Sequence, residues 1–454
     1  MRYDSRFLLK RFLLIFIAAC LPHSVFAENL IETIKAAKKY DSAFGAAKFQ
    51  YESVLPKRAQ ARAGILPNLS ASGNFNYTQS DVSYSNDTQP KYSLDYNSGG
   101  FAVQLRQPLF DLYNFSSFAQ SKYLITQAEA QMFQAESDLT LRVAQAYYDV
   151  LLAGDTLEQL RAQEKALTEQ LAAAKKSYEI GAATITDWQD SKAKFESVKA
   201  QEVVAENDKE NKQRVLEMSA GPEIGVPEPV KNNPLQTEPA DVNAWLTKVD
   251  ENQSVKAAQA AVEIADKEII KAQAGHFPTL NALASYSDNV QGPNSQIPGS
   301  VSTRTNDKMA GVQLQIPLFS GGGTAAKVEE MKKLKNKSVK DLENVRRQIS
   351  VQIRQAFTGV ISGLAQIKAL EAGVESSEVA LKSNTLGYSA GMRANVDVLN
   401  ALQQLYSAQT DLKRARYNAW IQLLKLKTLV GDMCVDNCNQ ISKITEQNNP
   451  YASR

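Results

Sequence analysis

The chain of 454 residues repeats itself once, at an offset of about 210 residues. Matching segments keep their order and spacing in the two copies: Ala61–Leu69 with Ala272–Leu280, Gln107–Phe110 with Ile316–Phe319, and Tyr178–Gly181 with Tyr388–Gly391. Agreement at one offset over separate segments indicates an internal duplication. Each copy is predicted to contain, in order, a helix, a strand pair, a very long helix, a short reversal with glycine and a second long helix.

The duplication sets the expected domain boundaries. The first repeat spans residues 28–220 and the second spans 242–431, between a leader over 1–27 and a polar, flexible tail over 432–454. The segment 221–241 joins the two repeats, and its five prolines prevent a continuous helix there.

Within each copy, apolar and small residues recur at alternating spacings of three and four. This stripe runs from Val143 to Tyr178 in the first copy and from Ile353 to Tyr388 in the second. The spacing is typical of a coiled-coil seam, and alanine and glycine in it allow helices to approach closely. Residues 116–181 contain no proline, so they predict a helix of about 100 Å, longer than a globular core requires. We therefore expect other helices or other copies of the chain to cover it.

Four short segments are predicted as strands. Residues 101–109 and 312–316 alternate apolar and polar side chains with a period of two, whereas 66–77 and 280–286 alternate more weakly. We expect strands of about 9 to 12 residues, the length of a tilted membrane-spanning strand. A proline is expected at an end of each strand, where a missing N–H is tolerated: Pro67, Pro108, Pro278 and Pro317.

The polar stretches 79–99 and 288–307 are expected to be the loops between paired strands. No apolar run of about 18 residues follows the leader, so the sequence predicts no membrane-spanning helix. Four strands cannot close a barrel, and open strand edges are not tolerated in lipid. Strands that span a membrane would therefore require several copies of the chain.

The N-terminus has the features of an export signal. Four basic residues precede the apolar run 12–21, and Val25-Phe26-Ala27 predicts cleavage after Ala27. Cys20 offers a competing lipoprotein site, but the small residues at the Ala27 site suit an ordinary signal peptidase. Loss of the leader changes the formal charge from +2 to about −1, which does not indicate nucleic-acid binding.

Residues with catalytic or metal-binding potential are few. Cys434 and Cys438 could form a disulfide in an oxidising compartment, with two free thiols as the alternative. His276 is the one histidine after the leader and has no ligand partners nearby in sequence, so no metal site is predicted. Gly321–Gly323 lacks the Gly-Lys-Ser/Thr of a phosphate loop. We expect no cofactor and no enzymatic activity, because no nucleophile or acid–base cluster is evident.

The stretch Gly387–Leu399 reads Gly-Tyr-Ser-x-Gly-x-Arg-x-x-Val-Asp-Val-Leu. With the paired proline–leucine strand boundaries, it resembles the TolC-type outer-membrane efflux channels, the outer membrane factor family. The resemblance extends over nearly the whole mature chain, to about Gly431. It implies an α+β membrane protein in which long antiparallel coiled-coil hairpins form a periplasmic α-barrel. Each subunit of a homotrimer would contribute four strands to a 12-stranded outer-membrane β-barrel.

The same resemblance implies a channel in the outer membrane of a Gram-negative bacterium, extending into the periplasm. It would conduct substrates passively in a tripartite efflux or type I secretion system. Its partners would be outer-membrane lipid, a periplasmic membrane-fusion adaptor and an inner-membrane pump of the ABC, RND or MFS type. The alternative is a periplasmic or secreted coiled-coil structural protein, which explains the heptads equally well but not the alternating strands.

The reversals at Gly181 and Gly391 are the expected position of a gate. Thr184, Thr186 and Asp187 surround the first, and Tyr388, Arg393, Asp397 and Asn400 surround the second. The resemblance implies that Asp187 is tied to Tyr388 and Arg393, and that Asp397 forms a ring of three acids in the bore. Asn400 stands where better-known members have a second acid, so fewer charges are expected. Alternatively, Asp187 and Asp397 only start helices, since Thr184 and Asp187 have capping-box spacing.

Overall fold

The computed structural model describes residues 29–83, 85, 92–222, 224–229, 240–295, 297 and 299–431. The expected leader with Cys20, and the tail with Cys434 and Cys438, lie outside the described residues. Among the helices of these ranges, none combines the length and the apolar character that a membrane crossing requires.

Contacts divide the chain into two compact units, and each unit draws on both repeats. The sheet unit comprises Ala47–Gln134 and Gln253–Gln348. The hairpin unit comprises the N-terminal segment to Ala46, Ala135–Asn252 and the chain from Ile349 onward. The duplicated halves are therefore intertwined in space and do not form two separate domains.

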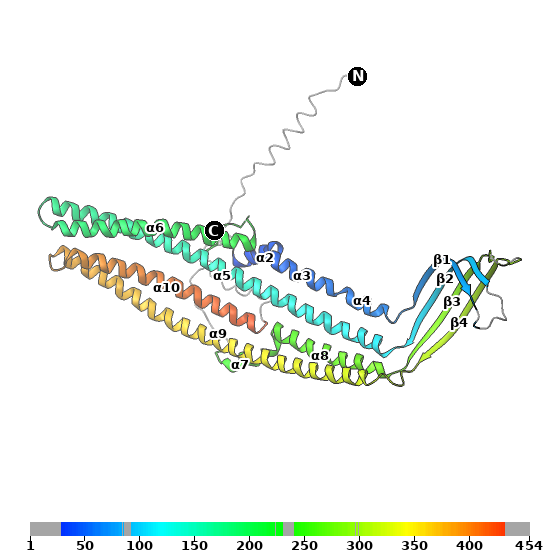
Figure 1. The fold of residues 1–454 in the computed structure, drawn as a ribbon. Helices are drawn as coiled ribbons and strands as arrows, with labels where there is room; N and C mark the ends of the chain where they lie inside the picture. Colours follow the sequence, from blue (N-terminus) through cyan, green and yellow to red (C-terminus); the bar gives the residue numbers. More distant parts are fainter. Residues whose placement is uncertain are drawn as a thin grey trace, which may run out of the picture. The chain divides into compact units, whose positions relative to one another are not determined.

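A four-stranded antiparallel sheet lies in the sheet unit, in the order β1-β2-β3-β4 (Figure 1). The strands are β1 Asn68–Val82, β2 Tyr92–Phe110, β3 Thr279–Gln291 and β4 Thr303–Gln315. The central pair β2–β3 joins the two repeats, with Phe101 opposite Asp288. The edges are β1 and β4, one from each repeat.

The strands are longer than predicted, with 15, 19, 13 and 13 residues. Each strand extends into a segment that was expected to be a loop. The polar residues there form the backbone hydrogen bonds of the sheet, although apolar and polar side chains do not alternate along them. The placement of Pro108 at a strand end was also wrong. It lies inside β2, beside a register shift between Pro108 and Phe110, where a bulge tolerates its missing N–H. Pro317 follows the end of β4.

The helices repeat with the same period as the sequence. The first repeat contains α2 Leu30–Tyr40, α3 Ser42–Val54, α4 Pro56–Ala63, α5 Leu112–Glu179 and α6 Ile185–Ala220. The second contains α7 Val242–Leu246, α8 Gln253–Gln273, α9 Gly323–Ser389 and α10 Asn395–Leu429, with short 3-10 helices at Val249–Glu251 and Ala274–His276. With 68 and 67 residues, α5 and α9 have the predicted length of about 100 Å.

The predicted heptad seam is the buried stripe of the hairpin unit. Val143, Val150 and Leu157 of α5 are buried, as are Ile353 and Val360 of α9. Further along α9 the seam residues are half-buried, while most of their neighbours are exposed. The part of the seam on α5 belongs to a core formed with α2, α6 and α10, which includes Ile34, Leu139, Tyr147, Leu216 and Leu424. The coiled-coil interpretation of the spacing is therefore confirmed.

Candidate functional site

The two reversals of the hairpin unit, residues 180–184 and 390–394, have the same backbone geometry, and we call them the tips. Gly181 has a φ of 75° and Gly391 a φ of 74°. In the first tip, Ala182 N and Ala183 N donate to Ser177 O at 2.8 and 3.2 Å. In the second, Met392 N and Arg393 N donate to Gly387 O at the same two distances. Glycine is favoured at this left-handed position after a helix end, so the tips follow directly from the sequence.

The helix that leaves the first tip starts with a capping box. Asp187 N donates to Thr184 Oγ1 at 3.2 Å, and Asp187 Oδ2 accepts from Thr184 N at 3.0 Å and from Thr184 Oγ1 at 2.7 Å. Thr186 is exposed on the first turn of α6. At the second tip, Asp397 Oδ2 accepts from Ala394 N at 3.3 Å. Ala394 has no side-chain acceptor, so only half of the box forms there.

The charged groups of the second tip lie mainly in solvent. Arg393 Nη1 is 4.0 Å from Asp397 Oδ2, with side chains 61% and 39% exposed. The side chain of Arg393 lies over Gly387, where a Cβ would be 2.8 Å from Arg393 Cγ. Among the described contacts, neither Tyr388 nor Arg393 bonds to Asp187, whose carboxylate is engaged by Thr184. Asn400 is exposed on α10.

An aromatic pair fastens the first tip. Tyr178 at the end of α5 stacks on Trp188 of α6, with ring centroids 5.8 Å apart and an interplanar angle of 16°. The position that matches Trp188 in the second repeat is Val398, which is buried. The first tip therefore has an aromatic clasp, and the second has an exposed ion pair.

A buried polar junction joins the two tips, and sequence reasoning missed it. Asn395, the first residue of α10, donates through Nδ2 to Ser191 Oγ at 2.7 Å and to Asp187 O at 3.3 Å. Ser191 Oγ also donates to Asp187 O, at 2.9 Å. Asn395 is 1% exposed and Ser191 is fully buried. The sequence could have predicted this junction, because Asn395 lies at a seam position that is otherwise apolar and a buried asparagine is known to fix the register of packed helices.

On the side of this junction away from the tips, the two hairpins contact each other first through an apolar layer and then through polar side chains. Leu167, Val198, Leu399 and Leu402 form the layer. Further from the tips, α10 bonds to α5 and α6 through side chains: Lys194 Nζ to Gln403 Oε1 at 2.7 Å, Gln159 Nε2 to Gln409 Oε1 at 3.2 Å, Lys413 Nζ to Asp155 Oδ1 at 2.9 Å and the Tyr417 hydroxyl to Asp155 Oδ2 at 2.7 Å. Burial and the neighbouring carboxylate of Asp155 raise the pKa of Tyr417, which keeps its hydroxyl protonated as a donor.

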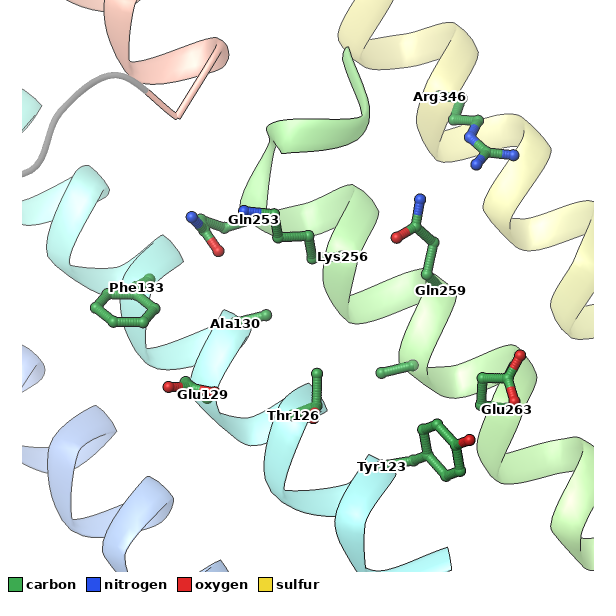
Figure 2. A pocket seen from close by; sticks show the side chains of 11 residues that line it. Tyr123, Thr126, Glu129, Ala130, Phe133, Gln253, Lys256, Gln259, Glu263 and Arg346 are labelled. Atoms are coloured by element: carbon green, nitrogen blue, oxygen red, sulfur yellow. The ribbon is translucent and has the colours of Figure 1, made fainter. Parts of the chain in front are cut away.

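Two open hollows lie elsewhere on the helices. In the hairpin unit, a groove of about 420 Å³ between α5, α6 and α10 is lined by Gln163, Lys194 and Tyr406 among others. In the sheet unit, a hollow of about 760 Å³ is lined by Tyr123 of α5, which points toward α8, and by Phe133 of α5 and Arg346 of α9 (Figure 2). No group of histidine, cysteine and acidic side chains able to hold a metal ion occurs within the described ranges.

Solved structures have a fold similar to that of this chain over most of its length. The outer membrane protein VceC from Vibrio cholerae matches with a TM-score of 0.74 at 20% identity, covering 88% of this chain and 96% of that one. CusC matches with a TM-score of 0.75 at 15% identity, covering 90% and 96%. The chain therefore has the fold of these outer membrane proteins.

Sequence comparison gives the family. The chain matches the model of the outer membrane efflux protein family over residues 33–221 and again over 249–432, and it belongs to that family. It is 29% identical to outer membrane protein TolC of Vibrio cholerae over 433 residues, 94% of this chain and 96% of that protein. It is 31% identical to alkaline protease secretion protein AprF of Pseudomonas aeruginosa over 414 residues, 89% and 85%.

The predicted resemblance, fold class, general function and location are therefore confirmed. The chain is an outer-membrane channel subunit of tripartite efflux or secretion systems, located in the outer membrane of a Gram-negative bacterium and extending into the periplasm. Channels of this family form trimers and work with adaptors and pumps. The family is a class of transport channel and not a class of enzyme.

Proposed function

We propose that this subunit forms a passive, non-enzymatic exit duct that is gated at the two tips. Substrates enter from an inner-membrane pump and leave to the exterior, and the tips determine whether the periplasmic end is open. The observation that supports this proposal is the junction of Asn395 with Ser191 and the Asp187 backbone, which ties the second hairpin to the first beside the charged residues of the tip.

Arg393 is the side chain that we expect to change partners. In the described chain it lies near Asp397 and is 61% exposed, so little packing opposes its rotation. In the closed trimer it bonds to Asp187 with help from Tyr388, and Asp397 then contributes one acid per subunit to a ring in the bore. Each exposed ion pair contributes about 0.2 to 1 kcal/mol, so the closed state is weak enough for an adaptor to release.

The partners are a periplasmic adaptor and an inner-membrane pump of the ABC, RND or MFS type. Support for secretion comes from AprF and from the proteases secretion protein PrtF of Dickeya chrysanthemi, to which the chain is 28% identical over 425 residues. Support for efflux comes from the outer membrane efflux protein BepC of Brucella suis, at 23% identity over 417 residues. Cargo is thus either a secreted protein or a small exported compound.

Single-channel recording in a planar bilayer tests the gate. Detergent-extracted protein is added, with and without a polyvalent cation on the side of the tips. A small, long-lived conductance that the cation blocks supports a nearly closed tunnel with an acid ring at Asp397. Asp187→Ala combined with Arg393→Ser should then raise the conductance of intact trimers. Unchanged conductance in that variant would leave both residues as helix starters, and a protein that stays in solution without detergent and never conducts would contradict the duct itself.

A further inference from the structure

The amide of Asn395 is only half satisfied. Its nitrogen donates to Ser191 Oγ and to the Asp187 carbonyl oxygen. Its Oδ1 is buried and accepts no hydrogen bond from any described residue. The orientation of the amide is set by chemistry, because a backbone carbonyl can only accept and so requires the nitrogen to face it. The oxygen is therefore the atom left without a donor.

The buried seam of α10 that Asn395 belongs to is otherwise apolar. The buried residues of α10 continue from Asn395 at spacings of three and four through Val398, Leu402 and Leu405. Asn395 thus lies at the end of this seam nearest the tip, and the other residues of the seam named here are aliphatic. Ser191 does not depend on the amide, because its hydroxyl already donates to the Asp187 carbonyl oxygen. An aliphatic side chain at position 395 would leave no new polar atom without a partner.

We propose that Asn395 is the release point of the gate, an inference that rests on the gating role proposed above. The amide fixes the register of α10 against α6 while the hairpins are joined, as they are in the described chain, and this junction does not depend on which partner Arg393 has. The joined hairpins leave the amide oxygen without a donor, and water satisfies that oxygen once they separate. The junction therefore holds the closed state less firmly than an apolar contact of the same size, because a buried acceptor without a donor is unfavourable.

The exposed links between the hairpins do not have this property. Lys194 and Gln403 bond in solvent, so their separation exchanges one set of hydrogen bonds for another with water. Among the described residues, the buried side-chain polar atom without a hydrogen-bond partner is the Asn395 oxygen, so separation of the hairpins gains a hydrogen bond to water there. In a trimer the effect acts at one equivalent position in each subunit.

Substitutions of opposite character test the inference. Asn395→Leu removes the unsatisfied oxygen and should close the gate further. Asn395→Asp places a carboxylate against the Asp187 carbonyl oxygen and should open it. Ser191→Ala removes the better acceptor of the Asn395 nitrogen without adding charge, and it should also open the gate if the aspartate variant does not fold. Gln404→Leu is the matched control, because Gln404 is an exposed amide on the same helix.

Hydrogen exchange at the amides of Leu399 to Leu402 gives a readout that does not depend on conduction. We expect exchange about tenfold slower in Asn395→Leu and about tenfold faster in Ser191→Ala and Asn395→Asp, from the typical penalty of an unsatisfied buried group. Gln404→Leu should match the wild type. Mean conductance in planar bilayers should fall in the leucine variant and rise in the other two.

The outcomes separate this inference from the gating proposal. Faster exchange in Asn395→Leu would overturn the inference, since it would mean that a donor serves the oxygen and that the amide is a simple clamp. Unchanged exchange in all three variants would overturn it as well. Opposite shifts in exchange without any change in conductance would support the strained junction at Asn395 and contradict the placement of the gate at the tips.

Discussion

The bond between Tyr417 of α10 and Asp155 of α5 should contribute more to the association of the hairpins than the ion pair beside it. Tyr417→Phe removes one hydroxyl, which lies 2.7 Å from Asp155 Oδ2. The ring can remain in place, stacked on Tyr148 with centroids 5.7 Å apart. The substitution therefore deletes a hydrogen bond to a charged acceptor and little else.

The size of the stability loss on substitution follows from how exposed the bonded side chains are. A hydrogen bond to a charged group contributes about 1.5 to 3 kcal/mol, and the Asp155 side chain is 23% exposed, which places Tyr417→Phe near the lower value. The ion pair of Lys413 with Asp155 is more exposed, at 34% for the lysine, so Lys413→Met should lower stability by about 0.2 to 1 kcal/mol. The tyrosine variant should thus open locally about tenfold more often.

Native-state hydrogen exchange on the amides of α10 measures this local opening in detergent-extracted trimers. Tyr406→Phe is the control, because Tyr406 lies on the same helix and its hydroxyl has no hydrogen bond among the described contacts. The reasoning would be refuted if Tyr417→Phe exchanged as slowly as Tyr406→Phe, or more slowly than Lys413→Met. Either result would show that water replaces the hydrogen bond from Tyr417 to Asp155 at no cost.

Three shorter predictions concern other parts of the chain. Gly391→Ala should destabilise the second tip by about 1 to 2 kcal/mol, measured by protease sensitivity there, because its φ is 74° although a Cβ would meet no neighbouring atom. Gly100→Ala should reduce the yield of heat-resistant trimer, since a Cβ would lie 2.8 Å from a backbone oxygen of β3, whereas Gly73→Ala, with its nearest atom at 3.7 Å, should not. Burial raises the pKa of Tyr148 and Tyr417, so the stability that they contribute is complete below about pH 10 and is lost as the pH rises through their higher folded values; thermal melting should report that loss.

Periodic features of the sequence predicted the large elements well. The duplication and the seam from Val143 to Tyr178 depend on local spacing, and a helix of 68 residues repeats its burial pattern many times. The strand ends were predicted less well, because β1 and β2 continue through polar residues in which apolar and polar side chains do not alternate. Backbone hydrogen bonds between the strands, and not a side-chain pattern, extend β1 and β2 there.

The tips show where sequence reasoning fails. The turns at Gly181 and Gly391 were predicted, since a left-handed glycine is a local requirement. The ties of Asp187 to Tyr388 and Arg393 stay a prediction, because they depend on how helices from distant parts of the chain meet. Asn395 was overlooked for the same reason: its bonds to Ser191 and Asp187 join residues more than 200 positions apart.

The number of strands in one chain fixes how copies can be joined. Because the sheet has an even number of antiparallel strands, α4, α5, α8 and α9 all connect to it at the same end. Two copies paired β1 to β1 by a two-fold axis would send their helices to opposite sides of a membrane. Pairing β4 of one copy with β1 of the next keeps the sheet ends of these four helices on one side, and such a head-to-tail contact has no natural end until the ring closes on itself.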